Sequence, residues 1–302
     1  MRVSSTLRIC VSTCLIFMSF YTISSEELPI LPEKKLHPYL VKNVINLESA
    51  NQLTDLFSKN EYLLKNVLRD QVVPSYFVEN LPSDLDTLPE EQKISVFLRL
   101  LLPTIKEVNQ QITKVREEII RLAKKPEKDW SREELEWVTE VEYIYGVKSH
   151  NIERLLLQVD IVPIGMVLAQ AIDESGWGTS YFAVKGNNLY GEHLSSHGGK
   201  FLTTPKGKIK VAAFDNLYSG TASYVHNLNS TFAYKNLWRV RKELRMKNNL
   251  TGYELVGTLE HYSSRGLSYV DNLRELIERH NLDDFDHIDL EQKNKVFIRF
   301  KN

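Results

Sequence analysis

One carboxylic acid stands where a helix would partly bury it. The run from Ile164 to Glu174 is mostly apolar, and positions 164, 167, 171 and 174 share one helix face. Glu174 ends this apolar ridge just before Gly176, where we expect the helix to stop. Burial and the negative end of the helix dipole both disfavour an ionised carboxyl and raise its pKa. A raised pKa suits a general acid that protonates a glycosidic oxygen. Spacing alone is more typical of an ordinary helix-end carboxylate.

Glu174 belongs to an ordered series of short motifs. The series is AQAIDESGWGTS (169–180), GNNLYG (186–191), FDN (214–216), SYVHNLN (223–229) and YSSRGLSYV (262–270). It resembles the signature of glycoside hydrolase family 73, the mannosyl-glycoprotein endo-β-N-acetylglucosaminidase-like peptidoglycan hydrolases, over about residues 150–281. The HNLN and YSxRG elements, with residues 97–103 and 159–163, resemble the Bax branch of Gram-negative bacteria. The N-terminal third matches only loosely.

The resemblance implies an activity and two catalytic positions. It implies hydrolysis of the β-1,4 bond after N-acetylglucosamine in the glycan strands of the cell wall. Carried over position by position, Glu174 is the general acid. Tyr262 matches a family tyrosine that positions the sugar or the attacking water; packing of an aromatic ring in the core is the alternative.

Four further residues are candidates for substrate binding. Trp177 and Asn188, with the turn around it, are expected to shape the floor of the binding cleft, or else to act structurally. Tyr190 and Tyr224 either stack on sugars or pack in the core, since aromatic rings serve both purposes.

The hairpin that follows the expected catalytic helix departs from the family pattern. Many members carry a second glutamate there, but residues 193–214 contain no Asp or Glu and instead contain four lysines. Glu192 and Asp215 flank this gap, and Glu192 is our candidate for the second group. Without it, the reaction uses the N-acetyl group of the substrate or a water held by Tyr262. The alternatives are a lytic transglycosylase, which leaves 1,6-anhydro ends, and a non-catalytic wall-binding scaffold.

Other chemistries lack a signature. The chain has no HExxH, GxSxG or phosphate-loop motif, so we predict no metal and no cofactor. His193 and His197 are interpreted as solvated loop residues. Asp173 lies about 100° around the helix from Glu174 and is expected to face solvent or a structural partner.

The first 25 residues have the layout of a secretory signal. Arg2 and Arg8 precede an apolar stretch, and Ser24 and Ser25 stand before the first acidic residues. Both cysteines, Cys10 and Cys14, lie in this leader, which excludes disulfides and thiolate chemistry from the rest of the chain. The full chain has 38 basic and 39 acidic residues, and loss of the leader leaves a net charge of about −3, which does not suggest nucleic-acid binding. We expect a periplasmic protein without a membrane span after cleavage, with unknown protein partners.

Helices are expected to position the motifs. Apolar spacing predicts a long helix over residues 89–124, kinked or broken at Pro103. Mixed helical patterning covers residues 37–70. Further helices are predicted over 131–145 and 149–158, from 160–163 onward, and over 217–227, 235–247, 251–254 and 269–280. Residues 192–213 are predicted to form a loop or β-hairpin, and residues 295–300 a strand or an ordered tail.

These elements give a mainly α (α+β) fold class. We expect a signal peptide (1–25), a helical N-terminal region (26–130), a glucosaminidase domain (131–282) and a C-terminal tail (283–302). The family resemblance implies a lysozyme-like catalytic domain with a small β-hairpin lobe.

Overall fold

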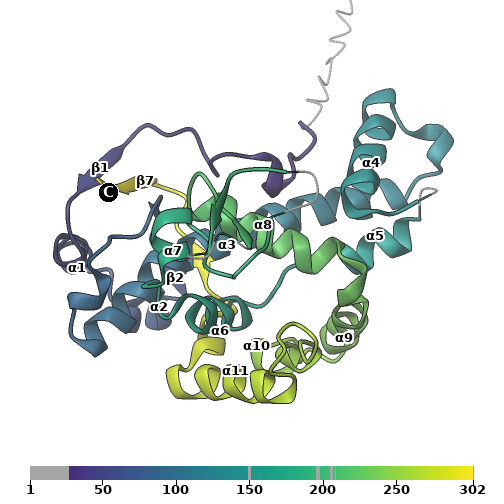
Figure 1. Ribbon diagram of the computed structural model, residues 1–302. Helices are drawn as coiled ribbons and strands as arrows, with labels where there is room; N and C mark the ends of the chain where they lie inside the picture. Colours follow the sequence, from purple (N-terminus) through teal and green to yellow (C-terminus); the bar gives the residue numbers. More distant parts are fainter. Residues whose placement is uncertain (1–26, 149–150, 195–197, 205–206, 208, 302) are drawn as a thin grey trace, which may run out of the picture.

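A computed structural model describes residues 27–148, 151–194, 198–204, 207 and 209–301. These residues form a mainly helical molecule with three small sheets, as the sequence predicts (Figure 1). No helix among the described residues is long and apolar enough to cross a membrane. The predicted leader lies outside the described residues.

The longest helix, α3 (Glu90–Ala123), is continuous through Pro103, so the predicted break there is wrong. Proline at position 103 leaves the carbonyl of Arg99 without its usual helical donor. The hydroxyl of Tyr62 donates to that carbonyl instead, at 2.6 Å. The guanidinium of Arg99 in turn donates to the carbonyl of Tyr62 at 2.9 Å. This exchange satisfies the backbone and lets the helix continue.

The other helices match most of the predicted ones. They are α1 (Ala50–Lys59), α2 (Leu64–Asp70), α4 (Arg132–Tyr145), α5 (Ile152–Gln158), α6 (Ile164–Ser175), α7 (Tyr181–Gly186), α8 (Leu217–Ser230), α9 (Lys235–Met246), α10 (Gly252–Leu255) and α11 (Leu267–His280). A capping box between Ser131 and Glu134 starts α4, as its sequence indicates. Helix α6 packs against α3, α10 and α11. Its residues from Ile164 to Ile172 are all buried, so it forms the centre of the molecule.

The N-terminal region contains strands as well as helices. Its strands are β1 (Val44–Leu47), β2 (Val72–Val73) and β3 (Tyr76–Val78). The helical patterning expected across residues 37–70 is therefore wrong at β1, whose Val44 and Ile45 pair in parallel with Phe297 and Ile298. A partner more than 250 positions away leaves no local signal.

The C-terminal tail is a strand, one of the two predicted alternatives. Strand β7 (Val296–Phe300) lies between β1 and β3, and pairs in parallel with both. Figure 1 shows this yellow strand beside the purple β1. Strand β6 (Asp289–Leu290) pairs with β2. Backbone hydrogen bonds thus join the tail to the strands of the N-terminal region.

The predicted hairpin is present. Strands β4 (Phe201–Thr203) and β5 (Lys210–Ala212) are antiparallel, with Leu202 opposite Val211. The domain boundary predicted at residue 130 stays a prediction; long-range packing crosses it, since α3 contacts α5, α6 and α8.

Candidate active site

Helix α6 presents Glu174 at its C-terminal end. Ile164, Val167 and Ala171, on the same face, are fully buried, whereas Glu174 is half-buried. Gly176 caps the helix in the left-handed conformation that its lack of a Cβ permits. Burial raises the pKa of Glu174; the neighbouring Asp173 also raises it, while a hydrogen bond from Tyr269 and the charge of Arg265 lower it. The local prediction of a partly desolvated acid at a helix end is confirmed.

A buried chain of hydrogen bonds runs up to this carboxyl group. The hydroxyl of Tyr224 donates to the side-chain oxygen of Gln170. The amide of Gln170 donates to the hydroxyl of Tyr269 at 3.0 Å. The Tyr269 hydroxyl is in turn hydrogen-bonded to Glu174. Because Gln170 lies one helical turn before Glu174, one face of α6 carries both the acid and the group that orients its partner.

Asp173 has a structural partner, which is one of its two predicted environments. Both of its oxygens accept from the guanidinium of Arg265, and one also accepts from the amide of Asn272 at 2.7 Å. The guanidinium carbon of Arg265 lies 4.6 Å from the centre of the Tyr269 ring. Asp173 therefore holds a cation beside Tyr269 and within electrostatic reach of Glu174.

A tight turn passes close enough to Glu174 that a side chain on Gly191 would crowd it. A Cβ atom on Gly191 would lie 3.2 Å from Oε2 of Glu174, and Gly191 has a φ of +70°. The buried side chain of Asn188 holds this turn: its oxygen accepts from the backbone of Glu192, and its amide donates to the carbonyls of Glu192 and Ala212. Of the two roles predicted for Asn188, the structural one describes it, because its side chain holds this turn.

Tyr262 lies against this turn. Its hydroxyl donates to the carbonyl of Tyr190 at 2.9 Å, and its ring stacks in parallel on Tyr269 with centroids 5.6 Å apart. Burial raises its pKa well above the usual value, and both Glu174 and Glu192 add to that rise. Tyr262 is therefore within electrostatic reach of both candidate acids.

Glu192 is close to the site but poorly solvated. Its Oε2 accepts from the hydroxyl of Ser223 at 3.0 Å, and its buried Oε1 has no partner among the described residues. Burial raises the pKa of Glu192 to about 8, and the Ser223 hydrogen bond lowers it only in part. The other flanking acid, Asp215, is exposed and pairs with Lys200.

The three aromatic candidates pack rather than project. The rings of Tyr190 and Tyr224 are buried and stack on each other with centroids 3.9 Å apart. Neither offers a face to a sugar, so packing describes them and the sugar-stacking alternative is wrong. Trp177 makes edge contacts with Phe97 and His280, and so braces the turn after α6.

Two candidate functional residues were not predicted from the sequence. Tyr269 is hydrogen-bonded to the acid. Its position in the motif YSSRGLSYV, seven residues after Tyr262, is the sequence feature that could have identified it. Tyr234 is half-buried, lies 6.2 Å from Tyr262 between ring centroids, and feels the charge of Glu192. It precedes α9 without any motif of its own. Among the aromatic residues at the site, Tyr234 is better placed than Tyr190 or Tyr224 to meet a sugar.

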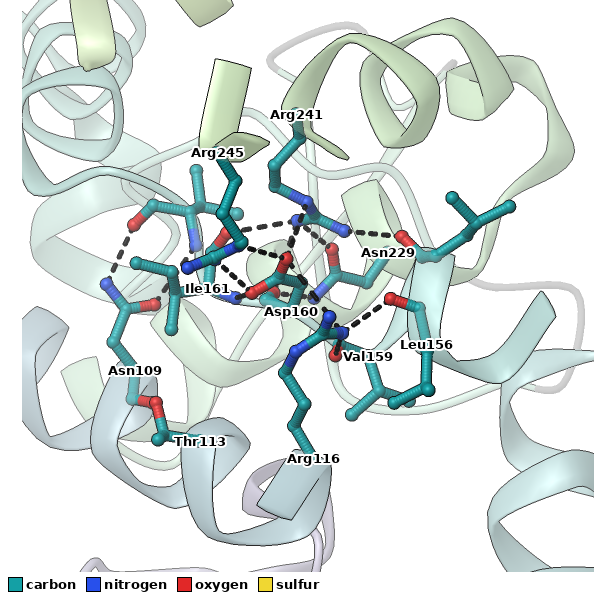
Figure 2. Close-up of polar contacts among 12 residues, drawn as sticks. Asn109, Thr113, Arg116, Leu156, Val159, Asp160, Ile161, Asn229, Arg241 and Arg245 are labelled. Atoms are coloured by element: carbon teal, nitrogen blue, oxygen red, sulfur yellow. Dashed lines mark hydrogen bonds and ion pairs between the residues drawn. The ribbon is translucent and has the colours of Figure 1, made fainter. Parts of the chain in front are cut away.

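A buried polar cluster fixes the start of α6 (Figure 2). The carboxylate of Asp160 accepts from Arg245 of α9, and lies 3.8–3.9 Å from guanidinium nitrogens of Arg241 and Arg116. Arg116 and Arg241 also donate to backbone carbonyls of residues 156–161. These carbonyls lie at and beyond the C-terminal end of α5, where cations are favoured and donors are missing.

Two asparagines complete this cluster. Asn229 of α8 donates to the carbonyl of Asp160 at 2.8 Å, and Asn109 of α3 both donates to and accepts from the backbone of Val162. Helices α3, α8 and α9 thus all hold the segment that leads into α6. The cluster sets where α6 begins, and therefore where Glu174 ends up.

Comparison with known proteins identifies a family and a relative that this chain resembles. Residues 149–282 match the glucosaminidase family, described as mannosyl-glycoprotein endo-beta-N-acetylglucosaminidase. The protein Bax of Escherichia coli strain K12 is 35% identical over 181 residues, which is 57% of this chain and 64% of Bax. The chain thus covers slightly less than two thirds of that relative. The predicted resemblance to Bax-like glucosaminidases is confirmed.

One solved structure is also similar. The catalytic domain of the autolysin Auto from Listeria monocytogenes aligns with 57% of this chain and 86% of its own length, at 17% identity and a TM-score of 0.32.

Proposed function

We propose that this Bax-like chain, with its glucosaminidase-family region at residues 149–282, is a peptidoglycan hydrolase that cleaves the β-1,4 bond after N-acetylglucosamine. The observation that carries the proposal is the environment of Glu174. Its half-buried carboxyl has a raised pKa, is hydrogen-bonded to Tyr269, and lies at the position that matches the family's acid. Such a group is more readily protonated than a free glutamate, and its hydrogen bond to Tyr269 fixes its direction.

In the proposed mechanism, Glu174 gives its proton to the glycosidic oxygen as the bond from that oxygen to the anomeric carbon breaks. Positive charge builds on the sugar ring. Water then adds to the anomeric carbon and releases a proton. The charge of Arg265 and the hydrogen bond from Tyr269 stabilise the Glu174 carboxylate that remains.

Glu192 is the candidate to receive the proton from that water. A two-carboxylate scheme requires an ionised partner. With a pKa of about 8, Glu192 is mostly protonated at neutral pH, and it reaches the base form only in alkaline solution or when substrate changes its surroundings. This observation favours a scheme with one acid, in which the N-acetyl group of the substrate or a water near Tyr262 takes part.

The same observation supports a second candidate, a lytic transglycosylase. There the sugar's own 6-hydroxyl attacks in place of water, and a 1,6-anhydro product results.

We also propose that residues 1–25 direct export to the periplasm, where the substrate lies. Cell fractionation with and without these residues tests that proposal.

Mass spectrometry of digested peptidoglycan tests the activity. Reducing N-acetylglucosamine ends are the expected product. Reducing N-acetylmuramic acid or 1,6-anhydro-N-acetylmuramic acid ends would assign the cut to another bond or to a transglycosylase. Absence of any soluble fragment would support a scaffold instead.

A further inference from the structure

A pocket of about 570 Å³ lies at the base of the β4–β5 hairpin, separate from the residues around Glu174. Five segments of the chain meet there. Its polar lining includes His37, Glu79, Lys185, Asn187, Asp215 and Arg299. None of these side chains takes part in the proposed reaction.

The pocket has cations that can receive a carboxylate. Lys185, in the last turn of α7, is exposed and makes no ion pair or hydrogen bond with another described side chain. Arg299 pairs with Glu79 at 2.6 Å, yet 53% of its side chain is exposed. Part of each cation therefore remains free to meet an anion.

The same pocket has acceptors that lack donors. Oε1 of the buried Glu79 and Oδ1 of Asn187 have no hydrogen-bond partner among the described residues. Nδ1 of His37 lies 3.3 Å from Glu79 Oε1 and also 3.3 Å from the amide nitrogen of Asn216. If that ring nitrogen accepts from Asn216, it cannot also donate to Glu79. Buried acceptors without donors are costly, and in most proteins such groups have a protein or water partner. A bound group that carries donors would supply that partner.

A group that matches this lining has an ammonium and a carboxylate close together. The carboxylate meets Lys185 and Arg299, and the ammonium meets the oxygens of Glu79, Asn187 and Asp215. We propose that the pocket binds the zwitterionic end of a diamino acid, as found in the peptide stems of peptidoglycan. This inference rests on the proposed function, which supplies a substrate with such stems.

The chain path places the two sites close together. Asn187 lines the pocket, and Gly191, four residues later, is so placed that an added Cβ would lie 3.2 Å from Oε2 of Glu174. Four residues span at most about 14 Å. A stem attached to a glycan bound at Glu174 is long enough to reach across that distance. The pocket would thus let the enzyme select strands that carry peptides.

A peptide titration tests binding directly. The probe is the tripeptide L-alanyl-γ-D-glutamyl-meso-diaminopimelate, added to the ¹⁵N-labelled protein. We expect saturable amide shifts at Asn187 and Asn216, weakened about fivefold by Lys185→Gln, which removes an ion pair of roughly 1 kcal/mol. A tripeptide with lysine in place of diaminopimelate lacks the side-chain carboxylate and should bind no better to wild type than to the variant. Absence of shifts in the pocket, or equal affinity of the two proteins for the first peptide, would overturn the proposal.

Cleavage assays separate this inference from the proposed function. Lys185→Gln should raise KM about fivefold on peptide-bearing glycan and leave peptide-stripped glycan unchanged. The control is Lys242→Gln, at an exposed position of α9, which should change KM on neither glycan. Equal effects of Lys185→Gln on both substrates would contradict a peptide site. If wild type cleaves neither glycan but still binds the peptide, the proposed activity fails and the pocket assignment stands.

Discussion

Three groups of different kinds surround Glu174. Tyr269 is hydrogen-bonded to it, Arg265 acts on it through charge, and Gly191 leaves space that an added Cβ would fill to within 3.2 Å of its Oε2. Since a general acid must point at one oxygen of the substrate, loss of any of these contacts should act on catalysis more than on folding.

Gly191 tests the close approach of the backbone. A Gly191→Ala methyl would press on Glu174 Oε2, and the φ of +70° adds strain of about 1–2 kcal/mol. We expect activity to fall at least tenfold, measured on purified peptidoglycan. Gly146→Ala is a matched control, because its φ is +63° and its Cβ would touch nothing. It should lose similar stability in urea and keep its activity; equal losses of activity would contradict the contact.

Tyr269 tests the origin of the Glu174 pKa. Its hydrogen bond favours the ionised carboxylate, so Tyr269→Phe should raise the pKa of Glu174 further. The acid works only when protonated, and activity is lost as pH rises through its pKa. The alkaline limb of the pH–rate profile should therefore move to higher pH in the variant. A limb that stays in place or moves to lower pH would show that Tyr269 does not hydrogen-bond the acid.

For single residues, the sequence predicts an environment correctly where that environment depends on neighbours in the chain. The apolar ridge and the stop at Gly176 correctly predicted a half-buried acid at a helix end. The roles of Tyr190 and Tyr224 were not predictable, because exposure of a ring depends on what packs over it. Here each ring covers the other.

Among the elements, α3 shows how a distant side chain overrides a local rule. Pro103 removes one helical hydrogen bond, and Tyr62, from the segment between α1 and α2, replaces it at the Arg99 carbonyl. Proline spacing alone predicts a break, and nothing near Pro103 in sequence reveals the substitute donor.

Tyr62→Phe should therefore destabilise α3. It leaves a buried carbonyl without a partner, at a cost of about 1–3 kcal/mol in the free energy of unfolding. Urea denaturation measures this change. Tyr143→Phe removes a hydroxyl from a ring that is 84% exposed and should change stability little. Similar stability of the Tyr62 variant and wild type would mean that the carbonyl does not depend on Tyr62.

At the scale of the whole molecule, β7 connects the N-terminal strands β1 and β3 to the catalytic half. Ile298 is fully buried in β7, and its carbonyl accepts from the backbone of Glu79. The carbonyl of Glu79 accepts in turn from Leu217, at the start of α8. The sequence predicted a strand or an ordered tail here. The two parallel partners could not be predicted, because they lie more than 200 positions earlier in the chain.

Ile298→Ala tests this connection. The cavity it leaves should lower the free energy of unfolding by about 2–4 kcal/mol. Because the sheet and the helices are joined, the backbone amide signals of β1 and β7 and the activity should disappear in one transition at the same urea concentration. Val44→Ala, at an exposed position of β1, is the milder control. Activity that survives beyond the loss of the strand signals would show that the catalytic half folds independently of the sheet.

The most direct test of the central claim is the Glu174→Gln variant assayed on purified peptidoglycan. Glutamine keeps the size of the side chain and can still be hydrogen-bonded to Tyr269, but it has no proton to give. The account predicts a loss of about 10²–10⁴-fold in the rate of glycan cleavage with unchanged stability in urea. Full activity in this variant would contradict the assignment of Glu174 as the acid.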